Sequence, residues 1–324
     1  MDFTSLGVPE PLAAALAARG ITEPTEIQRE VIPAACTGEN LIGEAPTGTG
    51  KTLAYLLPAL MRIDPAVRAA QVLVLAPTHE LAMQIAGAAR DLIQAAGLSV
   101  SVQALIGGAN VQRQIDALKK KPALIVGSAP RIVELHRLRK LKLQEVRLCV
   151  LDEFDRLLDK QHSAEVRTVL HLLPRERQML FLSATAAAAA VHAAEELCAL
   201  RIIRAAVQET MCENYYHIVP FRDKIKAVQK LTRRLPIRRG LVFVGRSFDA
   251  EKAAEKLQYE GIRVAALLGG ERRDQRRAAL NAIRTGRVQL LLSTDLAARG
   301  LDIEDVDYVV QVDLPEDVRT YRHR

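Results

Sequence analysis

The stretch Ala45-Pro46-Thr47-Gly48-Thr49-Gly50-Lys51-Thr52 joins a short apolar run at 40–43 to a segment of helical period at 51–61. Its two glycines let the backbone approach phosphate oxygens, and Lys51 brings positive charge to the β and γ groups. The Thr52 hydroxyl can ligate Mg²⁺ at a helix N-terminus. Ala45 stands where the general pattern has glycine, and the competing interpretation is a glycine turn that caps an ordinary helix. The strand-loop-helix context favours a loop that binds a nucleoside triphosphate and Mg²⁺ through residues 45 and 47–52.

A second polar stretch, Asp152-Glu153-Phe154-Asp155, follows the apolar run 148–151. Carboxylates at the end of a buried strand can hold Mg²⁺ through water and can orient an attacking water. We predict the metal role for Asp152 and the water role for Glu153, and we expect Phe154 to pack. The alternative is an exposed acidic helix start, which the helix dipole favours. With the phosphate loop upstream, the pair predicts nucleotide hydrolysis in which Lys51, Asp152 and Glu153 are catalytic.

The order of apolar runs and helical segments predicts the fold. We expect strands near 40–43, 71–76, 100–105, 123–126, 148–151 and 179–182, with helices such as 51–61 and 80–96 between them. This alternation predicts an α/β fold with a doubly wound parallel sheet, whose chemistry gathers at the carboxyl ends of the strands. The rhythm breaks around 205–214 and restarts with strands near 241–244, 264–268, 288–292 and 306–312. The sequence therefore predicts two domains, at 1–207 and 208–324.

Composition narrows the classes of protein and partner. The 324 residues hold 45 Lys and Arg against 38 Asp and Glu, a formal net charge of +7. This excess favours a polyanionic partner, and it would equally suit solvated helix faces. The four cysteines lie far apart, so neither a zinc site nor a disulfide framework is expected. Because no signal pattern or membrane-length apolar stretch is found, we expect a cytoplasmic protein without membrane contact.

Shorter strings follow many of the predicted strands. In the first half they are Gly-Ile-Thr-Glu-Pro-Thr-Glu-Ile-Gln at 20–28, Ala-Pro-Thr-His-Glu-Leu-Ala at 76–82, Gly107-Gly108, Gly-Ser-Ala-Pro-Arg at 127–131 and Ser-Ala-Thr at 183–185. In the second half they are Phe-Val-Gly-Arg at 243–246, the segment 268–276, Ser-Thr-Asp-Leu-Ala-Ala-Arg-Gly-Leu-Asp at 293–302 and Tyr-Arg-His-Arg at 321–324. Together with Asp-Glu-Phe-Asp, these strings resemble the motifs of DEAD-box ATP-dependent RNA helicases of superfamily 2. The match runs from Phe3 to Arg324.

The resemblance implies roles for residues of the first half. The string at 20–28 is similar to the Q motif, in which Gln28 would read adenine and Phe3 would stack on it. The string at 76–82 is similar to motif Ia, with His79 where arginine is usual. Ser183 and Thr185 match the motif that couples the ATP state to RNA remodelling, and the resemblance implies that they are catalytic together with Lys51, Asp152 and Glu153. The implied RNA contacts of this half are Pro77, Thr78, Gly108 and Arg131.

The second half carries further implied roles. Thr294 would contact RNA and Asp302 the ribose of ATP, while Arg246 and Arg276 are further RNA residues. The implied interdomain residues are Asp155, Arg299, His323 and Arg324. Residues 321–324 match only the opening of motif VI, so we expect a fragment or a natural truncation, with the second domain incomplete at its C-terminus.

The resemblance implies two RecA-like domains that close on ATP and Mg²⁺ and locally unwind or remodel RNA held through its backbone. It implies a monomer whose partner is RNA with little sequence preference. Partner proteins of ribosome assembly or RNA decay stay open, and the sequence names none. One alternative is a catalytically impaired module that binds RNA and ATP, because the later arginines of motif VI are absent. Another alternative is a DNA-translocating helicase. Stimulation of ATP hydrolysis by RNA and by DNA distinguishes the three.

Overall fold

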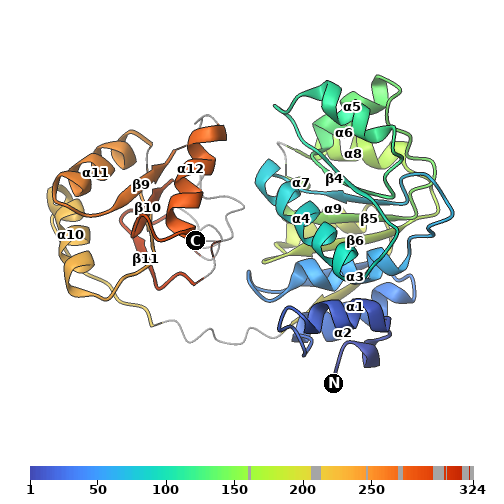
Figure 1. The fold of residues 1–324 in the computed structure, drawn as a ribbon, viewed down its shortest axis with the longest axis horizontal. Coiled ribbons are helices and arrows are strands. Elements are labelled where there is room, and N and C mark those ends of the chain that lie inside the picture. The colour runs from blue at the N-terminus through green and yellow to red at the C-terminus, as the bar shows by residue number, and fades with distance from the viewer. Residues whose placement is uncertain are drawn as a thin grey trace. The chain divides into compact units, whose positions relative to one another are not determined.

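A computed structural model of the chain describes residues 1–159, 162–205, 213–245, 247–268, 273–294, 303, 305–315 and 321. The chain divides into two compact units, Met1–Thr210 (unit 1) and Met211–Arg324 (unit 2). Each unit has its own sheet with helices packed against it (Figure 1). Within the described residues, no helix combines the length and the apolar composition needed to cross a bilayer.

Unit 1 is built on a seven-stranded sheet in the order β3-β4-β2-β5-β6-β1-β7, in which every described pair is parallel. The predicted α/β fold with a parallel sheet is confirmed. The last strand was not predicted, because it holds only two apolar residues between arginines and lies at an edge of the sheet. The strands are β1 Leu41–Glu44, β2 Val72–Leu75, β3 Val102–Leu105, β4 Leu124–Gly127, β5 Leu148–Asp152, β6 Gln178–Ser183 and β7 Arg201–Arg204.

Helices connect the strands of unit 1 and cover both faces of the sheet (Figure 1). The predicted helix at 51–61 has the bounds that the sequence indicated, and the alanine run at 186–190 leads into a helix. The helices are α1 Glu10–Ala17, α2 Glu26–Cys36, α3 Lys51–Met61, α4 His79–Ala95, α5 Val111–Leu118, α6 Ala129–Arg137, α7 Phe154–Leu157, α8 Ser163–Leu172 and α9 Ala188–Glu195.

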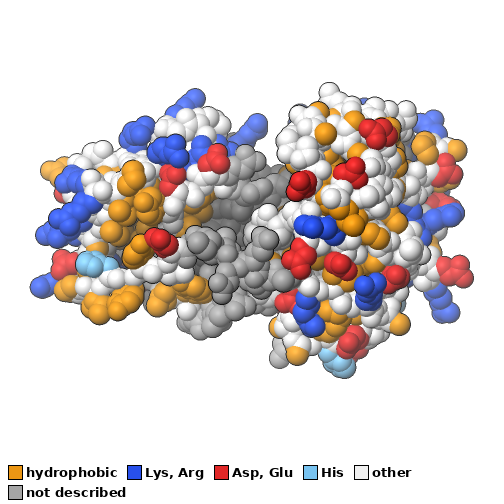
Figure 2. Space-filling model, turned by 90° about the horizontal axis from the view of Figure 1, so that it is seen from below, with side chains coloured by type: hydrophobic (Ala, Val, Ile, Leu, Met, Phe, Trp, Pro, Cys, Tyr) orange, Lys and Arg blue, Asp and Glu red, His pale blue; other side chains and the backbone are white. Residues whose placement is uncertain are grey.

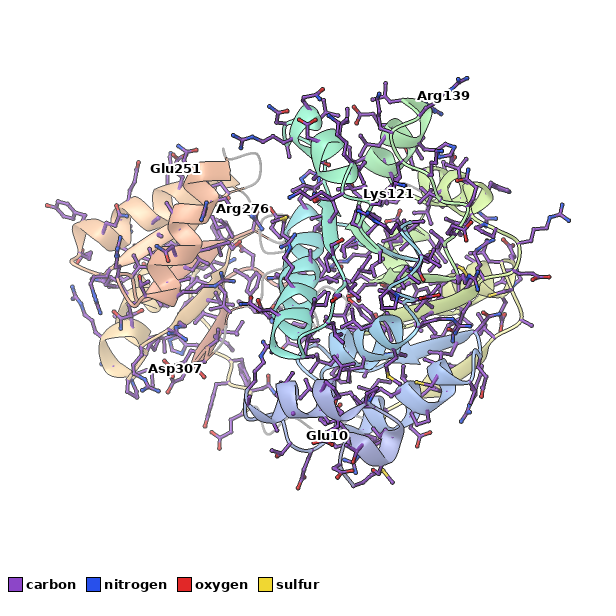
Figure 3. All side chains as sticks on the ribbon, turned by 45° about the vertical axis from the view of Figure 1, so that its right-hand side comes forward. Glu10, Lys121, Arg139, Glu251, Arg276 and Asp307 are labelled. Carbon is purple, nitrogen blue, oxygen red and sulfur yellow. The ribbon has the colours of Figure 1, made fainter. Side chains whose placement is uncertain are left out.

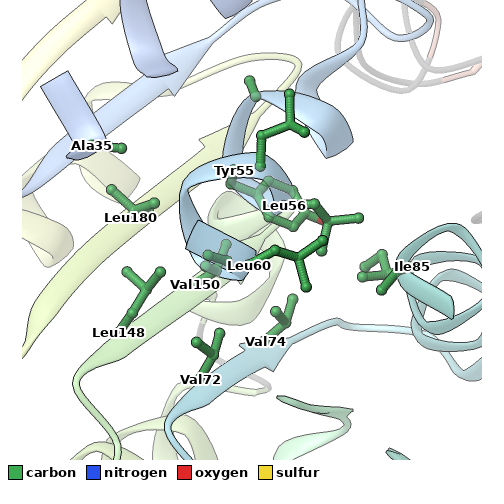
Figure 4. Packing of buried hydrophobic residues seen from close by; sticks show 14 of the residues in the cluster. Ala35, Tyr55, Leu56, Leu60, Val72, Val74, Ile85, Leu148, Val150 and Leu180 are labelled. Carbon is green, nitrogen blue, oxygen red and sulfur yellow. The ribbon is translucent and has the colours of Figure 1, made fainter. Parts of the chain in front are cut away.

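The pleat of the central strands divides the core of unit 1 into two clusters. Val72 and Val74 point to the cluster that contains the α3 side chains Leu56 and Leu60 (Figure 4). The alternate residues Leu73 and Leu75 belong to the second cluster, with residues of α6 and α8. Because successive side chains of a strand face opposite sides, both faces of the sheet are covered and the strands read as continuous apolar runs. This rigid core fixes where each strand ends.

Unit 2 has a smaller parallel sheet in the order β11-β8-β10-β9. All four predicted strands are present, each within two residues of the expected start. They are β8 Gly240–Phe243, β9 Val264–Leu267, β10 Leu290–Ser293 and β11 Tyr308–Gln311. The helices are α10 Lys224–Arg234, α11 Ser247–Tyr259 and α12 Arg273–Arg284. Two buried clusters, one around Val242 and Leu292 and one around Leu291, form the core.

Candidate active site

The polar motifs of unit 1 lie at one edge of its sheet, the edge formed by the carboxyl ends of the strands (the carboxyl edge). The loop 45–50 follows β1, the carboxylates follow β5, and Ser183 ends β6, which lies between β1 and β5. The register aligns Glu44 with Ser183 and Asp152 with Leu182, so the three strand ends are level. Parallel strands thus bring residues from distant parts of the sequence to one place, as the crevice rule for such sheets predicts.

The loop at 45–50 has the backbone of a phosphate-binding loop. Gly48 and Gly50 have φ of 82° and 84°, a region that favours glycine, and Gly50 directly precedes α3. The Lys51 ammonium donates to the Ala45 carbonyl at 2.5 Å and to the Pro46 carbonyl at 2.7 Å. Burial lowers the pKa of Lys51, against the attraction of the nearby carboxylates. The helix N-terminus and this lysine together form an anion site.

Asp152 is held in a buried hydrogen-bonded pair with Tyr55 of α3. The Tyr55 hydroxyl donates to Asp152 Oδ2 at 2.8 Å, and the Glu153 N–H donates to Oδ1 at 3.0 Å. Burial raises the pKa of Asp152, while the Tyr55 hydrogen bond and the charge of Lys51 lower it. Burial and the neighbouring carboxylate raise the pKa of Tyr55 well above its usual value, so Tyr55 stays a donor. The pair connects the phosphate-loop helix to the carboxylate strand.

Glu153 has a left-handed backbone, with φ of 52° and ψ of 48°, at the start of the short helix α7. Such a conformation is strained for a residue with a side chain and is found at functional sites. Its carboxylate lies 3.0 Å from the Arg156 guanidinium, and burial raises its pKa while Arg156 lowers it. A carboxylate with a raised pKa is a stronger base than an ordinary glutamate, which suits the acceptance of a proton from water. Phe154 packs edge-on against Phe181, as expected of a core residue.

The predicted adenine residue Gln28 contacts the phosphate loop itself. Its side-chain amide donates to the Gly50 carbonyl at 3.0 Å and accepts from the Thr25 N–H at 2.9 Å. The Thr25 hydroxyl donates to the Thr49 carbonyl at 2.7 Å. Phe3 is 2% exposed within the core around α2, so its ring offers no open face for stacking in this structure. The stacking role of Phe3 stays a prediction that requires this ring to move.

Ser183 and Thr185 form a small turn beside the phosphate loop. The Ser183 hydroxyl donates to the Thr185 carbonyl at 2.7 Å, and the Ser183 carbonyl accepts from the Ala45 N–H at 3.1 Å. The Thr185 hydroxyl is buried without a hydrogen-bond partner among the described residues. Glu44 accepts from the Ala186 N–H at 3.0 Å and pairs with Arg204 of β7 at 3.0 Å. A buried hydroxyl without a protein partner is a group that can hydrogen-bond a bound ligand.

The remaining predicted residues of unit 1 lie at the ends of β2, β3 and β4. Three helices of eight or more residues, α4, α5 and α6, begin there, so the positive ends of their dipoles lie at this edge. Pro77 is half-buried, and Thr78 caps α4 by accepting from the Leu81 N–H at 3.2 Å. Gly108 has a positive φ of 62°. Next to it, Nε2 of His79 would lie 3.1 Å from a Cβ placed on Gly107, so the ring closes against this loop.

Arg131 lies at the same edge but is buried. Its guanidinium nitrogens lie 3.5 Å from the Ala109 carbonyl and its Nε lies 2.9 Å from the Glu134 carboxylate. With 7% of its surface exposed, it braces the loop after β3. A direct RNA contact by Arg131 stays a prediction.

In unit 2 the structure describes Arg276 and Thr294 of the predicted residues. Arg276 is half-buried on α12, and Thr294 follows β10 with its hydroxyl buried and without a hydrogen-bond partner among the described residues. In unit 1, Asp155 is buried and accepts from the Arg156 N–H at 3.1 Å. The other predicted residues, Arg246, Arg299, Asp302, His323 and Arg324, lie outside the described residues.

Comparisons with known proteins agree with this arrangement. The family model described as DEAD/DEAH box helicase matches residues 25–193, and the model described as helicase conserved C-terminal domain matches residues 223–324. The chain belongs to the DEAD-box helicase family. The two parallel sheets are accordingly RecA-like.

Relatives within the family cover nearly all of the chain. The DEAD-box ATP-dependent RNA helicase CshC of Bacillus cereus is 41% identical over 309 residues, which are 94% of this chain and 78% of that protein. The probable ATP-dependent RNA helicase YfmL of Bacillus subtilis is 39% identical over 95% of this chain and 82% of its own length. Among solved structures, S. cerevisiae Dbp5 bound to RNA and ADP BeF3 matches with a TM-score of 0.85 at 27% identity, over all of this chain and 85% of that chain.

Sequence reasoning missed several residues that shape this DEAD-box site. Tyr55, Thr25 and Glu44 contact site residues across 24 to 142 positions of sequence. Tyr55 lies on the buried face of α3, so the sequence pattern indicates an ordinary core residue. Thr25 precedes Gln28 by three positions, and this capping-box spacing was its available signal.

Proposed function

We propose that the chain is an ATP-dependent RNA helicase that grips RNA through its backbone and separates short duplexes locally when its two domains close on ATP. The observation that carries this proposal is the order of strand ends in unit 1. The ends of β5, β6 and β1 hold the nucleotide motifs, and those of β3, β4 and β2 hold the proposed RNA motifs. Since β2 and β5 are neighbours, ATP and RNA would bind side by side on one rigid edge.

The donor set fits ATP with Mg²⁺. No group of three or more His, Cys, Asp or Glu among the described residues could hold a metal alone. Mg²⁺ usually binds through one or two protein oxygens plus substrate phosphates and waters, and Thr52 with Asp152 supplies this set. Bound Mg²⁺ would neutralise charge on the phosphates. Lys51 binds the β and γ phosphates, and Glu153 orients the attacking water and accepts its proton.

Adenine and sugar are assigned to groups outside the phosphate loop. Gln28 has a second N–H and a second lone pair on its amide with which to read the base, but it is 1% exposed, so, like Phe3, it must first become accessible. Asp302 would contact the ribose. Ser183 and Thr185 would report the state of the γ phosphate, because Ser183 already bonds the first residue of the phosphate loop.

RNA is proposed to bind through phosphates and sugars rather than base edges. In unit 1 the N-termini of α4, α5 and α6 favour phosphates over neutral groups, and Pro77, Thr78 and Gly108 lie at these ends. In unit 2 the proposed contacts are Arg246, Arg276 and Thr294. Arg131 would brace this surface and reach RNA only by leaving its buried position.

At the level of the whole chain, we assign residues 1–207 to the ATP-binding RecA-like domain and 208–324 to the C-terminal one. Asp155, Arg299, His323 and Arg324 would contact across these domains on closure. We propose a monomer that works in the cytoplasm, since nothing in the assigned chemistry needs a second copy or a membrane.

Steady-state ATP hydrolysis with and without single-stranded RNA, together with separation of a short labelled duplex, tests the proposal. We expect RNA to raise turnover, DNA of the same sequence to raise it less, and strand separation to require ATP. Binding of both ligands without turnover would favour a binding module instead. Equal stimulation by RNA and DNA would favour a DNA-translocating enzyme.

A further inference from the structure

Within unit 1, the charges of residues 1–208 are strongly segregated. Residues 1–208 hold 23 Lys and Arg and 21 Asp and Glu, a net charge of only +2. Two short segments, 119–121 and 137–147, hold eight of the basic residues and one acidic residue, a net charge of +7. The rest of 1–208 therefore carries 15 basic and 20 acidic residues, a net charge of −5. A separation of this size creates a local positive field on a nearly neutral unit.

Both segments lie at the edge opposite the active site, where the strands begin (the amino edge). Segment 119–121 leads into β4 and segment 137–147 leads into β5, while Arg68 precedes β2 between them. Backbone hydrogen bonds tie the three entries together: the Gln71 N–H donates to the Ala123 carbonyl, and the Arg147 N–H donates to the Gln71 carbonyl. The segments 119–121 and 137–147 together with Arg68 form the amino-edge basic surface. Figure 2 shows Lys and Arg side chains at the right-hand edge of unit 1, with Asp and Glu side chains between them.

These cations are exposed and largely uncompensated. Every Lys and Arg of the amino-edge basic surface is exposed. Lys119 pairs with Asp116 at 2.8 Å. The other eight form no ion pair with any residue in the described part of the chain. In segment 137–147 the apolar residues Leu141, Leu143 and Val146 are buried, so packing holds the loop in place and directs its cations outward.

Two of the cations occupy backbone positions that favour glycine. Arg139 has φ of 57° and Lys121 has φ of 53° (Figure 3). Arg139 follows the C-cap of α6: its own N–H donates to the His136 carbonyl, and the Lys140 N–H donates to the Leu135 carbonyl. This is the Schellman pattern, in which glycine is the usual residue at the Arg139 position. A long cation held in a strained conformation points to a use for its charge.

A polar cavity of about 330 Å³ opens on the same surface. Arg68, Lys120 and Lys121 line it, together with the hydroxyl residues Ser99 and Ser101. Asp64 is its one acidic lining residue, and its carboxylate accepts from the Ala66 N–H at 2.9 Å. At about 30 Å³ per water, the cavity has room for a hydrated phosphodiester group. Cations and hydroxyls together are the donors that bind phosphate oxygens.

We infer that the amino-edge basic surface is a second RNA-binding surface, which takes phosphates of the RNA that flanks the strand gripped at the carboxyl edge. This inference rests on the proposed function, because it requires that the chain bind RNA at the carboxyl edge. Arg147 and Asp152 lie five residues apart along β5, so the two edges are about 16 Å apart. At about 3.4 Å per stacked nucleotide, the flank must extend at least five nucleotides beyond the gripped segment.

RNA fits this surface better than an acidic protein does. An RNA already held at one edge is presented to the other at a high effective concentration, so weak phosphate contacts suffice. The cations lie in a row before the starts of three adjacent strands, β4, β2 and β5, which suits a polymer with regularly spaced charges. The apolar side chains of 141–146 face inward, and Leu138 is the one large apolar side chain of segment 137–147 that is exposed, which leaves little for a protein core contact.

The test measures how the removal of cations from the full chain changes its affinity for a short RNA and for a long RNA. The triple variant Lys120→Ala/Lys140→Ala/Lys142→Ala removes three cations from the surface, and Arg19→Ala/Arg29→Ala/Arg90→Ala removes three exposed cations elsewhere in unit 1. Affinity is measured by fluorescence anisotropy for a single strand of about 10 nucleotides and for the same strand extended to about 30 nucleotides.

We expect the amino-edge variant to bind the long RNA about tenfold more weakly, with a slope of log K against log salt reduced by about 2, and to bind the short RNA like the parent. The matched control should resemble the parent on both. Equal losses on short and long RNA, or equal losses in both variants, would overturn the inference in favour of a general electrostatic effect. Displacement of the long RNA's flank by polyglutamate as readily as by polyphosphate would point to an acidic protein instead.

A second variant separates function from folding. Arg139→Gly relieves the positive φ, so its Tm should be no lower than that of the parent, yet its affinity for the long RNA should fall. Unchanged long-RNA affinity in this well-folded variant would refute the role of Arg139. Failure of short-RNA stimulation of ATP hydrolysis in the parent itself would count against the proposed function and not against the second surface.

Discussion

Replacing Tyr55 with phenylalanine removes one oxygen from the active site and leaves the packing of α3 unchanged. The hydroxyl donates to Asp152 at 2.8 Å, and both residues are buried. A hydrogen bond to a charged group contributes about 1.5–3 kcal/mol, so we expect the free energy of unfolding to fall by about 2 kcal/mol. For a unit of this size that corresponds to a fall in Tm of about 4–8 °C, measured by calorimetry on the full chain.

The same change should alter the pH dependence of nucleotide binding. Burial raises the pKa of Asp152 and the Tyr55 hydrogen bond lowers it, so Tyr55→Phe should raise the pKa further. Mg²⁺ needs the ionised carboxylate, so affinity for Mg²⁺ with ATP should fall with acidification, and this fall should begin at higher pH in the variant. The stability of the protein without nucleotide should depend on pH in the opposite direction. A carboxyl group whose pKa is raised in the folded state stabilises the fold as pH falls through that pKa, and loses this contribution as pH rises.

Tyr259→Phe is the matched control, because Tyr259 is 91% exposed and the same atom is removed without a buried partner. Calorimetry and isothermal titration from about pH 5 to 8 should find this control identical to the parent. A Tyr55→Phe protein with the Tm and the pH profile of the parent would refute the reasoning, since it would mean that the hydroxyl neither stabilises Asp152 nor sets its pKa.

Three further substitutions test the phosphate loop and the carboxylates. Lys51→Ala should weaken ATP binding about 10- to 100-fold with little change in Tm, because in the free protein the cost of burying the ammonium offsets its hydrogen bonds to loop carbonyls and its attraction to the carboxylates; unchanged affinity by titration would contradict its phosphate role. Glu153→Gln should bind ATP normally and lose about 100-fold in turnover, and an equal loss of binding would argue against its water role. Gly50→Ala places a Cβ 2.3 Å from Gln28 Nε2 at φ of 84°, whereas Gly48→Ala meets no atom within 4 Å at φ of 82°. Both share the backbone strain, so a larger loss of Tm and ATP affinity in Gly50→Ala would measure the displacement of Gln28, and equal losses would exclude it.

Much of the fold could be predicted because its strands are buried on both faces and end in recognisable turns. The run 148–151 with its carboxylates, and the loop before 51–61, marked both the strands and their functional ends. β7 was missed because an edge strand needs few apolar residues, and two isoleucines between arginines are too short a run to indicate a strand. The Tyr55–Asp152 pair could not be predicted, since nothing in a helix pattern shows which buried side chain reaches a strand 97 residues away. The burial of Phe3 and Arg131 likewise depends on packing and not on motif spacing.

The hydrogen bonds of Gln28 link base recognition to the shape of the phosphate loop. Its amide holds the Gly50 carbonyl, while the Thr25 hydroxyl holds the Thr49 carbonyl, so two successive peptide units just before α3 depend on the start of α2. If Gln28 reads adenine, as the resemblance to the Q motif implies, a base that bonds its remaining N–H and lone pair acts on a side chain that already positions Gly50. A nucleotide without that base would still bind Lys51 and the helix N-terminus through its phosphates, but it would leave the phosphate loop less restrained. Adenine selectivity would then appear in turnover as well as in affinity, because the γ phosphate is positioned by the same loop.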